Sequence, residues 1–335
     1  MKEIEENIQE YIITGDGGNR FPKMLVMILG RENLYDKHKQ LHKLYQIPSQ
    51  VVKASSGGNF NLSKASNVLK QLNSKMGGDL YHLKLPDKMR NMKTMLIGID
   101  VCHAGGNSIV GFAASVNKEL SQYYSDFIVQ KKGQEVVTNS IKGCIKNAID
   151  VFVRKHSNNN PTDIIIYRDG VSAAERAQVI DREIVQFQAA FNEIYNQAAA
   201  RPKITLLIVN KRIIQSFFVL DGQNRLSNPP SGCIIDRDLV EKSQNPQKEF
   251  DFFLVPIKGT QGCMRPTHFF VPLNQSTLTK LEIERLTFDL CHYYFNWAGP
   301  IKVPAPCMYA HKIADLFTRI GYSKASKALG NYGKE

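Results

Sequence analysis

The chain has 335 residues, of which 43% are hydrophobic, so length and composition favour a folded protein with two domains over a disordered one. Its 43 lysines and arginines exceed its 31 aspartates and glutamates, and the net charge of +12 favours a polyanionic partner such as nucleic acid, although charge alone does not separate RNA from an acidic membrane. The first twenty residues lack the apolar core of a signal peptide and no run is long enough to span a bilayer, so we expect a soluble intracellular protein, cytoplasmic or nuclear. The six cysteines form no CxxC pair, so we expect neither a zinc site nor a disulfide framework.

The first ninety residues alternate between helical and strand-like segments. We expect a helix at 2–11, a strand at 23–30, a helix at 34–45, a strand at 49–55 and a helix at 62–76. This alternation predicts a βαβα unit with a parallel sheet. Gly77 and Gly78 end the last helix, and the polar stretch at 86–93 marks the expected domain boundary.

The rest of the chain begins with three strand-like segments in succession. The expected elements are strands at 94–100, 108–115 and 122–130, a helix at 136–155, a strand at 163–168, a helix at 172–199, strands at 204–210, 215–220, 251–256 and 268–272, and helices at 277–293 and 307–320. Three strands followed by helix, strand, helix and strand is the order of a ribonuclease H-like fold.

Two of these strands end in aspartate. The run "LIGIDVCH" (96–103) reaches Asp100, and "IIIYRDG" (164–170) reaches Asp169 directly before Gly170. An aspartate at the end of a strand commonly bonds turn amides, so a single one is weak evidence for a site. If the two strands are neighbours, however, their carboxylates project from one edge and repel each other unless a cation lies between them. The pair therefore predicts a site for a hard divalent ion.

Longer segments carry a family resemblance. "IGIDVCH", "YRDGVS", "QGCMRPTHFF" and "NWAGPIKVPAPCMYAHK" together resemble the PIWI domain of the Argonaute family, in its PIWI branch, and residues from about 20 to 90 resemble that family's MID domain. The resemblance implies an α/β protein: a Rossmann-like MID domain at 1–90, incomplete at its N-terminus, then a ribonuclease H-like PIWI domain with a mixed sheet at 91–335. It also implies cleavage of a target RNA paired to a small guide RNA, in silencing of the piRNA type.

The family's catalytic tetrad is Asp, Glu, Asp and His, and the resemblance places it at Asp100, Glu135, Asp169 and His311. It implies two magnesium or manganese ions held by the two aspartates and the histidine, which activate a water and stabilise the leaving oxygen. Taken singly, Glu135 is also explained as a charge favouring a helix N-terminus, and His311 as a core histidine. His103 belongs to the same motif, and we interpret it as a structural or supporting residue.

The resemblance further implies a pocket for the guide 5′-phosphate in the first domain. Its residues are Tyr35, Lys39, Gln50, Gln71 and Lys75. Spacing i, i+4 places the first two on one helix face and the last two on another. The tyrosine is implied to stack on the first base, and the amide and ammonium donors are implied to bind the phosphate. Each lysine alone is equally explained by a solvated helix face, so the prediction depends on all five together.

Three basic residues outside the first domain are candidate contacts to the sugar-phosphate backbone: Lys211, Arg212 and Lys302. Two features depart from the family pattern. The chain has no room for the family's N-terminal and PAZ domains, so we expect a fragment or a short form. It also ends in the polar "KALGNYGKE", where the family usually has an apolar tail whose carboxylate reaches the phosphate pocket, which leaves metal-assisted phosphate binding there in doubt.

Three functions remain open from the sequence. The first is a guide-directed endoribonuclease with the full tetrad. The second is a non-cleaving module that binds guide and target and silences through recruited partners. The third is another ribonuclease H-like nuclease or a transposase, which would lack the phosphate pocket. We expect guide RNA and target RNA as partners, possible binding of silencing-complex proteins, no membrane, and a monomer.

Overall fold

The computed structural model describes residues 23–30, 35–36, 38–40, 47–54, 61–104, 106–135, 137, 141–220, 222–241, 243–259 and 262–320. These residues form two units. One holds those up to Tyr81 together with Phe295–Ala298 and those from Arg319 onward, and the other holds His82–Tyr294 and Gly299–Thr318. In the described part of the chain, no helix is long and apolar enough to cross a membrane. The helix expected at 2–11 lies outside the described residues.

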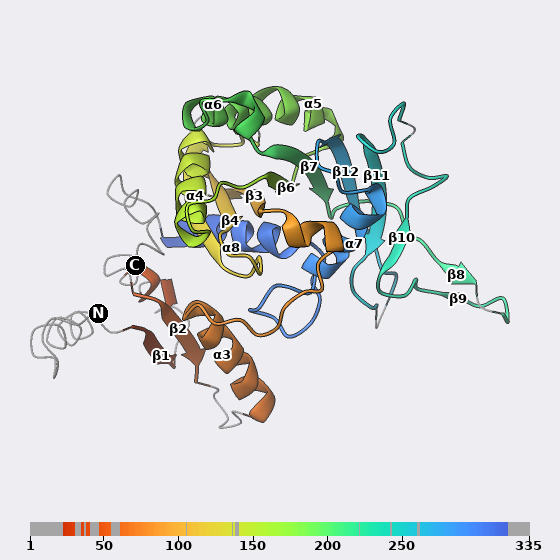
Figure 1. Ribbon diagram of the computed structural model, residues 1–335. Coiled ribbons are helices and arrows are strands. Elements are labelled where there is room, and N and C mark those ends of the chain that lie inside the picture. The colour runs from red at the N-terminus through yellow and green to blue at the C-terminus, as the bar shows by residue number, and fades with distance from the viewer. Residues whose placement is uncertain are drawn as a thin grey trace, which may run out of the picture. The chain divides into compact units, whose positions relative to one another are not determined.

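The first unit contains a pair of parallel strands and a helix (Figure 1). Strand β1 (Leu25–Leu29) pairs with β2 (Ser49–Lys53), and helix α3 (Leu62–Lys75) follows. The helix begins after Asn61, whose side chain accepts a hydrogen bond from the Lys64 amide and so satisfies one free donor of the first turn. The ends of the two expected strands and of the helix expected at 62–76 are confirmed to within two residues. Of the helix expected at 34–45, only residues 35–36 and 38–40 are described, and they are helical.

The second unit is built on an eight-stranded mixed sheet in the order β10-β11-β12-β7-β6-β3-β4-β5. Its strands are β3 (Thr94–Ala104), β4 (Asn107–Ser115), β5 (Tyr123–Lys131), β6 (Asp163–Asp169), β7 (Lys203–Asn210), β10 (Cys233–Ile235), β11 (Phe250–Val255) and β12 (Thr267–Asn274). The first three are antiparallel neighbours, β6 and β7 run parallel to β3, and the last three are antiparallel. The predicted ribonuclease H-like order is confirmed.

Helices cover this sheet. They are α4 (Ile141–Lys155), α5 (Arg176–Gln178), α6 (Val185–Ile194), α7 (Lys280–Leu290) and α8 (Ala305–Ile320). Helices α4 and α6 lie side by side in Figure 1 and share one apolar core with the sheet, which includes Ile97, Ile166 and Phe152. Because side chains alternate along a strand, the residues next to these in sequence point to the other face. That second face of β3 carries Gly98 and Asp100.

Two glycines allow α8 to lie directly against this second face. A methyl group on Gly98 of β3 would overlap the carbonyl of Pro306, and one on Gly111 of β4 would overlap the carbonyl of Ala310. Gly111 is also the register partner of Asp100 in the antiparallel pair. The absence of side chains at these two positions therefore brings the α8 backbone close to the strand that bears Asp100.

The structure differs from the sequence predictions in two segments. The continuous helix expected at 172–199 is instead a 3-10 turn at Ala173–Glu175, α5, a π-helical turn at Val179–Ile184, α6 and a second 3-10 turn at Ala198–Ala200. The π-helical turn contains Glu183, which is buried and bonded to Arg168, so the wider turn accommodates an inward charge that a regular α-helix pattern did not predict.

The second difference is the strand expected at 215–220. Only β8 (Val219–Leu220) forms there, paired with β9 (Leu226–Ser227), and both side chains of β8 are exposed. The run at 215–220 is therefore not a core strand: Phe217 packs on Phe253 of β11, and the other five residues of the run are exposed. The short strand β10 has no counterpart in the prediction, and the polar stretch at 86–93 contains a 3-10 helix at Asp87–Asn91.

Candidate functional site

The two aspartates lie at equivalent positions of neighbouring parallel strands. Ile99 of β3 is registered with Arg168 of β6, and Asp100 and Asp169 are the residues that follow them. Alternation along each strand turns both carboxylates away from the α4 and α6 core. Asp100 is 5% exposed and Asp169 is 1% exposed. Two buried acids are therefore held at one edge of the sheet, as the sequence predicted.

Cationic and imidazole side chains pair with both acids. The Nζ atom of Lys211, just beyond β7, lies 2.6 Å from Oδ2 of Asp169, and Nδ1 of His311 on α8 lies 2.7 Å from Oδ2 of Asp100. Burial and the neighbouring charge of Asp100 raise the pKa of Asp169, while Lys211 lowers it. Burial alone would lower the pKa of Lys211, but the two aspartates raise it overall, so the ammonium stays charged.

Glu135 reaches the same place from the segment after β5. Its Oε1 atom accepts from Nη1 of Arg168 at 2.9 Å, and its Oε2 atom lies 2.8 Å from Nε2 of His103. A side chain on Gly170 would lie 3.2 Å from Oε1 of Glu135 and 3.7 Å from Oδ1 of Asp100. Gly170, which has a φ of +92°, therefore leaves open the space between these two carboxylates. Burial raises the pKa of Glu135, and Arg168 and His103 oppose that rise.

The donor set fits a hard divalent ion chemically, since carboxylate oxygens and an imidazole are suitable ligands. Oδ1 of Asp169 is buried and has no hydrogen-bond partner among the described residues, so it is available to an ion. The other carboxylate oxygens are largely taken by protein donors, and within the described residues no three His, Cys, Asp or Glu side chains are placed to hold an ion together. Metal binding here would require Lys211 to leave Asp169 and the hydrogen bond between His311 and Asp100 to break, so that these side chains become available to an ion.

Sequence reasoning did not identify Arg168, one of the residues that hold Glu135 in place. Arg168 is fully buried, and it also bonds Glu183 through Nε at 3.0 and 3.1 Å. Burial alone would lower the pKa of Arg168, but the two glutamates raise it, so the guanidinium is permanently charged. The available signal was an arginine inside the otherwise apolar run "IIIYRD". The interpretation of His103 as a supporting residue agrees with its contacts, because its two ring nitrogens form hydrogen bonds with Ser108 and Glu135.

The five residues predicted for the guide phosphate also come together, within the first unit. Nζ of Lys75 donates to the Ser49 carbonyl at 2.8 Å and to Oε1 of Gln50 at 2.7 Å, and Nε2 of Gln50 donates to Oε1 of Gln71 at 2.9 Å. Nζ of Lys39 donates to Oγ of Ser49 at 2.9 Å and lies 5.6 Å from the ring centre of Tyr35. Two ammonium groups and two amides thus converge on the start of β2.

The two lysines of this cluster are poorly compensated. Burial lowers the pKa of Lys39 to about 8, and burial together with the charge of Lys39 lowers the pKa of Lys75 to about 8. Burial and both lysines also lower the pKa of the neighbouring His38 to about 4, so it is neutral at pH 7. Within the described part of the chain, the hydrogen-bond partners of the two lysine ammonium groups are uncharged oxygens. A buried ammonium, that of Lys39, beside the more exposed ammonium of Lys75, with neutral partners for both, is a favourable site for an anion.

The three residues predicted to contact the sugar-phosphate backbone lie in the second unit and differ in their exposure and bonding. Lys211 is bonded to Asp169 and one-third exposed, so it belongs to the carboxylate site. Arg212 and Lys302 have exposed side chains. Arg212 lines a cavity of about 370 Å³ that also contains His268 and Asp251, whose Nε2 and Oδ2 atoms lie 2.6 Å apart.

Comparison with known proteins places the whole described chain in one group. The Piwi domain family matches residues 24–320. Piwi-like protein 1 of Gallus gallus is 35% identical over 333 residues, which is 94% of this chain and 36% of that protein, and Piwi-like protein 3 of Homo sapiens is 36% identical over 84% of this chain and 31% of that protein. The chain spans about a third of the length of these relatives.

Solved structures of Argonaute and Piwi proteins have the same fold as this chain. The crystal structure of Kluyveromyces polysporus Argonaute with a guide RNA has a TM-score of 0.79 at 22% identity, over 94% of this chain and 39% of that one. The crystal structure of Drosophila Piwi has a TM-score of 0.75 at 23% identity, over 96% of this chain and 43% of that one. At these identities the likeness shows the fold, and the mixed sheet is of the kind found in the PIWI domains of these proteins.

Proposed function

Because the chain belongs to the Piwi family, we propose that it binds a small guide RNA through the guide's 5′-phosphate and cleaves an RNA paired with that guide. The observation that carries this proposal is the convergence of Asp100, Glu135, Asp169 and His311 at one edge of the sheet, with Gly170 leaving space between two of the carboxylates. The family match supports RNA as the substrate class, and the net charge of +12 agrees with it.

The guide would be held by the cluster of Tyr35, Lys39, Gln50, Gln71 and Lys75. Among the described residues its two ammonium groups bond to uncharged oxygens, so a terminal phosphate would supply negative charge there. Tyr35 would offer its ring to the first base, as aromatic side chains do in sites for single-stranded nucleic acid. The structure of a similar Argonaute was solved with a guide RNA, which supports this assignment.

The cleavage site would use the paired acids. Asp100, Asp169 and His311 would hold two magnesium or manganese ions, with Oδ1 of Asp169 free to act as a ligand. When bound, such ions supply an activated water and stabilise the leaving oxygen. Arg168 and His103 would hold Glu135 in position beside Asp100, since they bond both of its carboxylate oxygens. Arg212 and Lys302 would contact the sugar-phosphate backbone through their exposed charges.

The test is a cleavage assay with the full 335-residue chain. The chain is loaded with a 5′-phosphorylated guide RNA and given a labelled complementary RNA with magnesium or manganese, beside the Asp169→Ala variant. We expect one cut at a fixed distance from the guide 5′ end, reduced on the order of 10³-fold in the variant. Guide affinity should be unchanged in the variant, because Asp169 lies in the other unit from the phosphate cluster. Loss of both activities would indicate misfolding, which circular dichroism would reveal.

A second function is favoured by one specific observation. The carboxylates are already bonded to Lys211, His311 and Arg168, and no described cluster of ligating side chains is arranged around an ion. On this alternative the chain holds guide and target without cutting, and silences through recruited partners. Tight guide binding with no cleavage in either metal would support the alternative and overturn the slicing proposal.

A further inference from the structure

The segment that carries Glu135 lies between the end of β5 at Lys131 and the start of α4 at Ile141. It brings Oε1 of Glu135 to within 3.2 Å of the point where a side chain on Gly170 would begin, and Oδ1 of Asp100 lies 3.7 Å from the same point. Two carboxylates this close repel each other, and burial raises the pKa of Glu135. Contacts elsewhere must therefore hold the segment in place.

Val137, two residues after Glu135, is fixed through both of its backbone polar groups. Its N–H group donates to Oε1 of Glu183 at 3.0 Å, and its carbonyl accepts a hydrogen bond from Nε2 of Gln186 at 2.7 Å. The Val137 side chain is fully buried in the core that the sheet shares with α4 and α6. We call Glu183 and Gln186 the Val137 clamp. Because the chain from Val137 back to Glu135 is short, the clamp limits how far Glu135 can move from the carboxylate site.

Glu183 also holds Glu135 by a second route, through Arg168. Nε of Arg168 donates to both carboxylate oxygens of Glu183, at 3.0 and 3.1 Å, while Nη1 donates to Oε1 of Glu135 at 2.9 Å and Nη2 donates to the Glu135 carbonyl at 2.7 Å. Replacing Glu183 would therefore leave a buried guanidinium partly unpaired and would disturb more than the clamp. By contrast, Gln186 bonds only backbone carbonyls among the described residues, so it isolates the contribution of the clamp.

The placement of Gln186 is not explained by stability alone. Its side chain is half-buried in the first turn of α6, just after the π-helical turn at Val179–Ile184. Its Oε1 atom is buried and has no hydrogen-bond partner among the described residues, and a buried amide oxygen without a partner is destabilising. What the glutamine gains in this position is the bond from Nε2 to the Val137 carbonyl. π-Helical turns of this kind are frequent at functional sites.

From these contacts we propose that Gln186 is a positioning residue for the cleavage reaction: it fixes the Val137 backbone from α6 and thereby keeps Glu135 at the carboxylate site. Without its amide donor, the segment opens more often and Glu135 leaves Asp100, because one hydrogen bond fewer then opposes the repulsion between the two carboxylates. The consequence for cleavage rests on the proposed function, whereas opening of the segment is measured in the free chain.

The first measurement is amide hydrogen exchange of the full chain without RNA or metal, with fragmentation in the mass spectrometer that assigns the Val137 amide. Gln186→Leu removes the donor and keeps a side chain of similar size. We expect exchange of the Val137 amide to become about tenfold faster, the factor that corresponds to the loss of one hydrogen bond of ordinary strength. Exchange in strands β3 and β6 should stay unchanged, because the opening is local.

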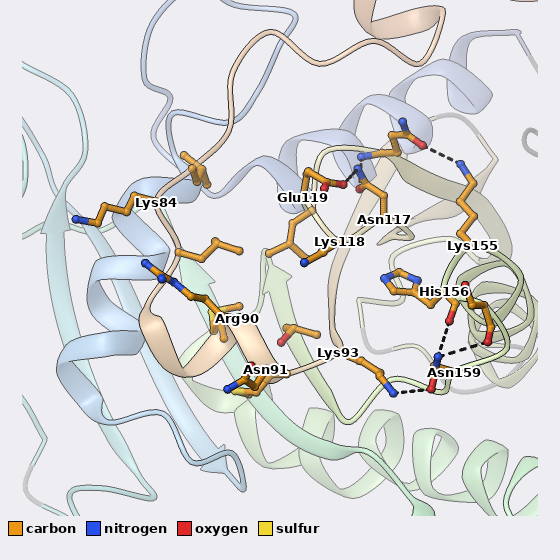
Figure 2. A pocket seen from close by; sticks show the side chains of 18 residues that line it. Lys84, Arg90, Asn91, Lys93, Asn117, Lys118, Glu119, Lys155, His156 and Asn159 are labelled. Atoms are coloured by element: carbon orange, nitrogen blue, oxygen red, sulfur yellow. Dashed lines mark hydrogen bonds between the residues drawn. The ribbon is translucent and has the colours of Figure 1, made fainter.

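Two control variants separate the clamp from general loosening. Gln188→Leu makes the same substitution at an exposed position of α6. Asn159→Leu removes a bond of the same kind, since Nδ2 of Asn159 donates to the carbonyl of His156 at 2.8 Å. Asn159 lines the cavity of about 980 Å³ shown in Figure 2, which lies beside the start of β3, towards the end of that strand away from the carboxylates. Both controls should change exchange of the Val137 amide less than about twofold.

The second measurement is single-turnover cleavage of the complementary RNA at varied concentrations of the guide-loaded chain. We expect the maximal rate of Gln186→Leu to fall about tenfold, while guide affinity and the concentration that gives half the maximal rate stay unchanged. A positioning residue acts on the reacting groups, so it lowers the rate without weakening RNA binding. A general structural defect would weaken both, and the two control variants should weaken neither.

Three results would overturn the proposal. Unchanged exchange of the Val137 amide in Gln186→Leu would mean that the glutamine does not hold the segment. Equally faster exchange in Gln188→Leu would mean that α6 is loosened as a whole. Faster exchange with an unchanged maximal cleavage rate would mean that the clamp does not control Glu135. If the unmodified chain cleaves no RNA, the proposed function fails instead, and exchange of the Val137 amide alone decides whether the clamp exists.

Discussion

The lysine and glutamine cluster of the first unit, proposed to bind the guide phosphate, and the carboxylate site of the second unit are opposite in charge and also in how that charge is compensated. Lys39 is buried and Lys75 is more exposed, and the two ammonium groups repel each other and donate to uncharged oxygens. In the carboxylate site, by contrast, Glu135 and Asp169 are bonded to Arg168 and Lys211. Among the described residues the first site therefore has no acid to compensate its lysines, whereas in the second an external cation must compete with cations of the protein.

The largest effect should come from removing an internal cation of the carboxylate site. Arg168→Ala would leave Glu183 and Glu135 without their guanidinium partner, and breaking a buried ion pair in this way costs about 3–5 kcal/mol of unfolding free energy. The measurement is urea denaturation without RNA. Arg154→Ala is the matched control, since its pair with Asp150 is exposed and should contribute less than about 1 kcal/mol. Similar losses in the two variants would show that Arg168 does not compensate this site.

The next largest effect concerns the cluster of the first unit, where the described partners of the lysines are uncharged. Lys75→Met should reduce the preference for a 5′-phosphorylated over a 5′-hydroxyl guide by about 10- to 100-fold, the range expected for lost charge-assisted hydrogen bonds. Filter binding of both guides measures this ratio. Lys64→Met, on an exposed position of the same helix, serves as the control. A ratio that stays the same in Lys75→Met would exclude this cluster as the phosphate site.

The smallest effect is a pH dependence that only the first site should show. Because Lys39 and Lys75 have pKa values of about 8, raising the pH from 7 to 9 removes ammonium charge, and affinity for a 5′-phosphorylated guide should fall about tenfold. Binding of a 5′-hydroxyl guide should change much less. The free protein should respond in the opposite sense: these pKa values are lowered from 10.5, so folding stability should rise between about pH 8 and 10.5. A phosphate affinity independent of pH would contradict the assignment.

Much of the second unit could be predicted because strand patterns and segment order carry strong local signals. The runs that contain Asp100 and Asp169 are short, apolar and β-branched, and their ends were placed within a few residues. The error at 215–220 has a clear cause: β-propensity describes a half-buried surface, and at β8 no described element provides one. The interrupted helix after β6 was missed because burial of Glu183 against Arg168 is a long-range contact.

The sequence by itself determined which residues can carry chemistry: two aspartates at strand ends, a histidine and glutamate in family motifs, and five polar residues in the first unit. Only the tertiary structure decided which neighbouring groups compensate the charges of these residues. Strand register brings Asp100 beside Asp169, and Gly98 and Gly111 admit α8 so that His311 reaches Asp100. Charge compensation depends on distance and burial, and those are set by packing between elements that no local pattern encodes.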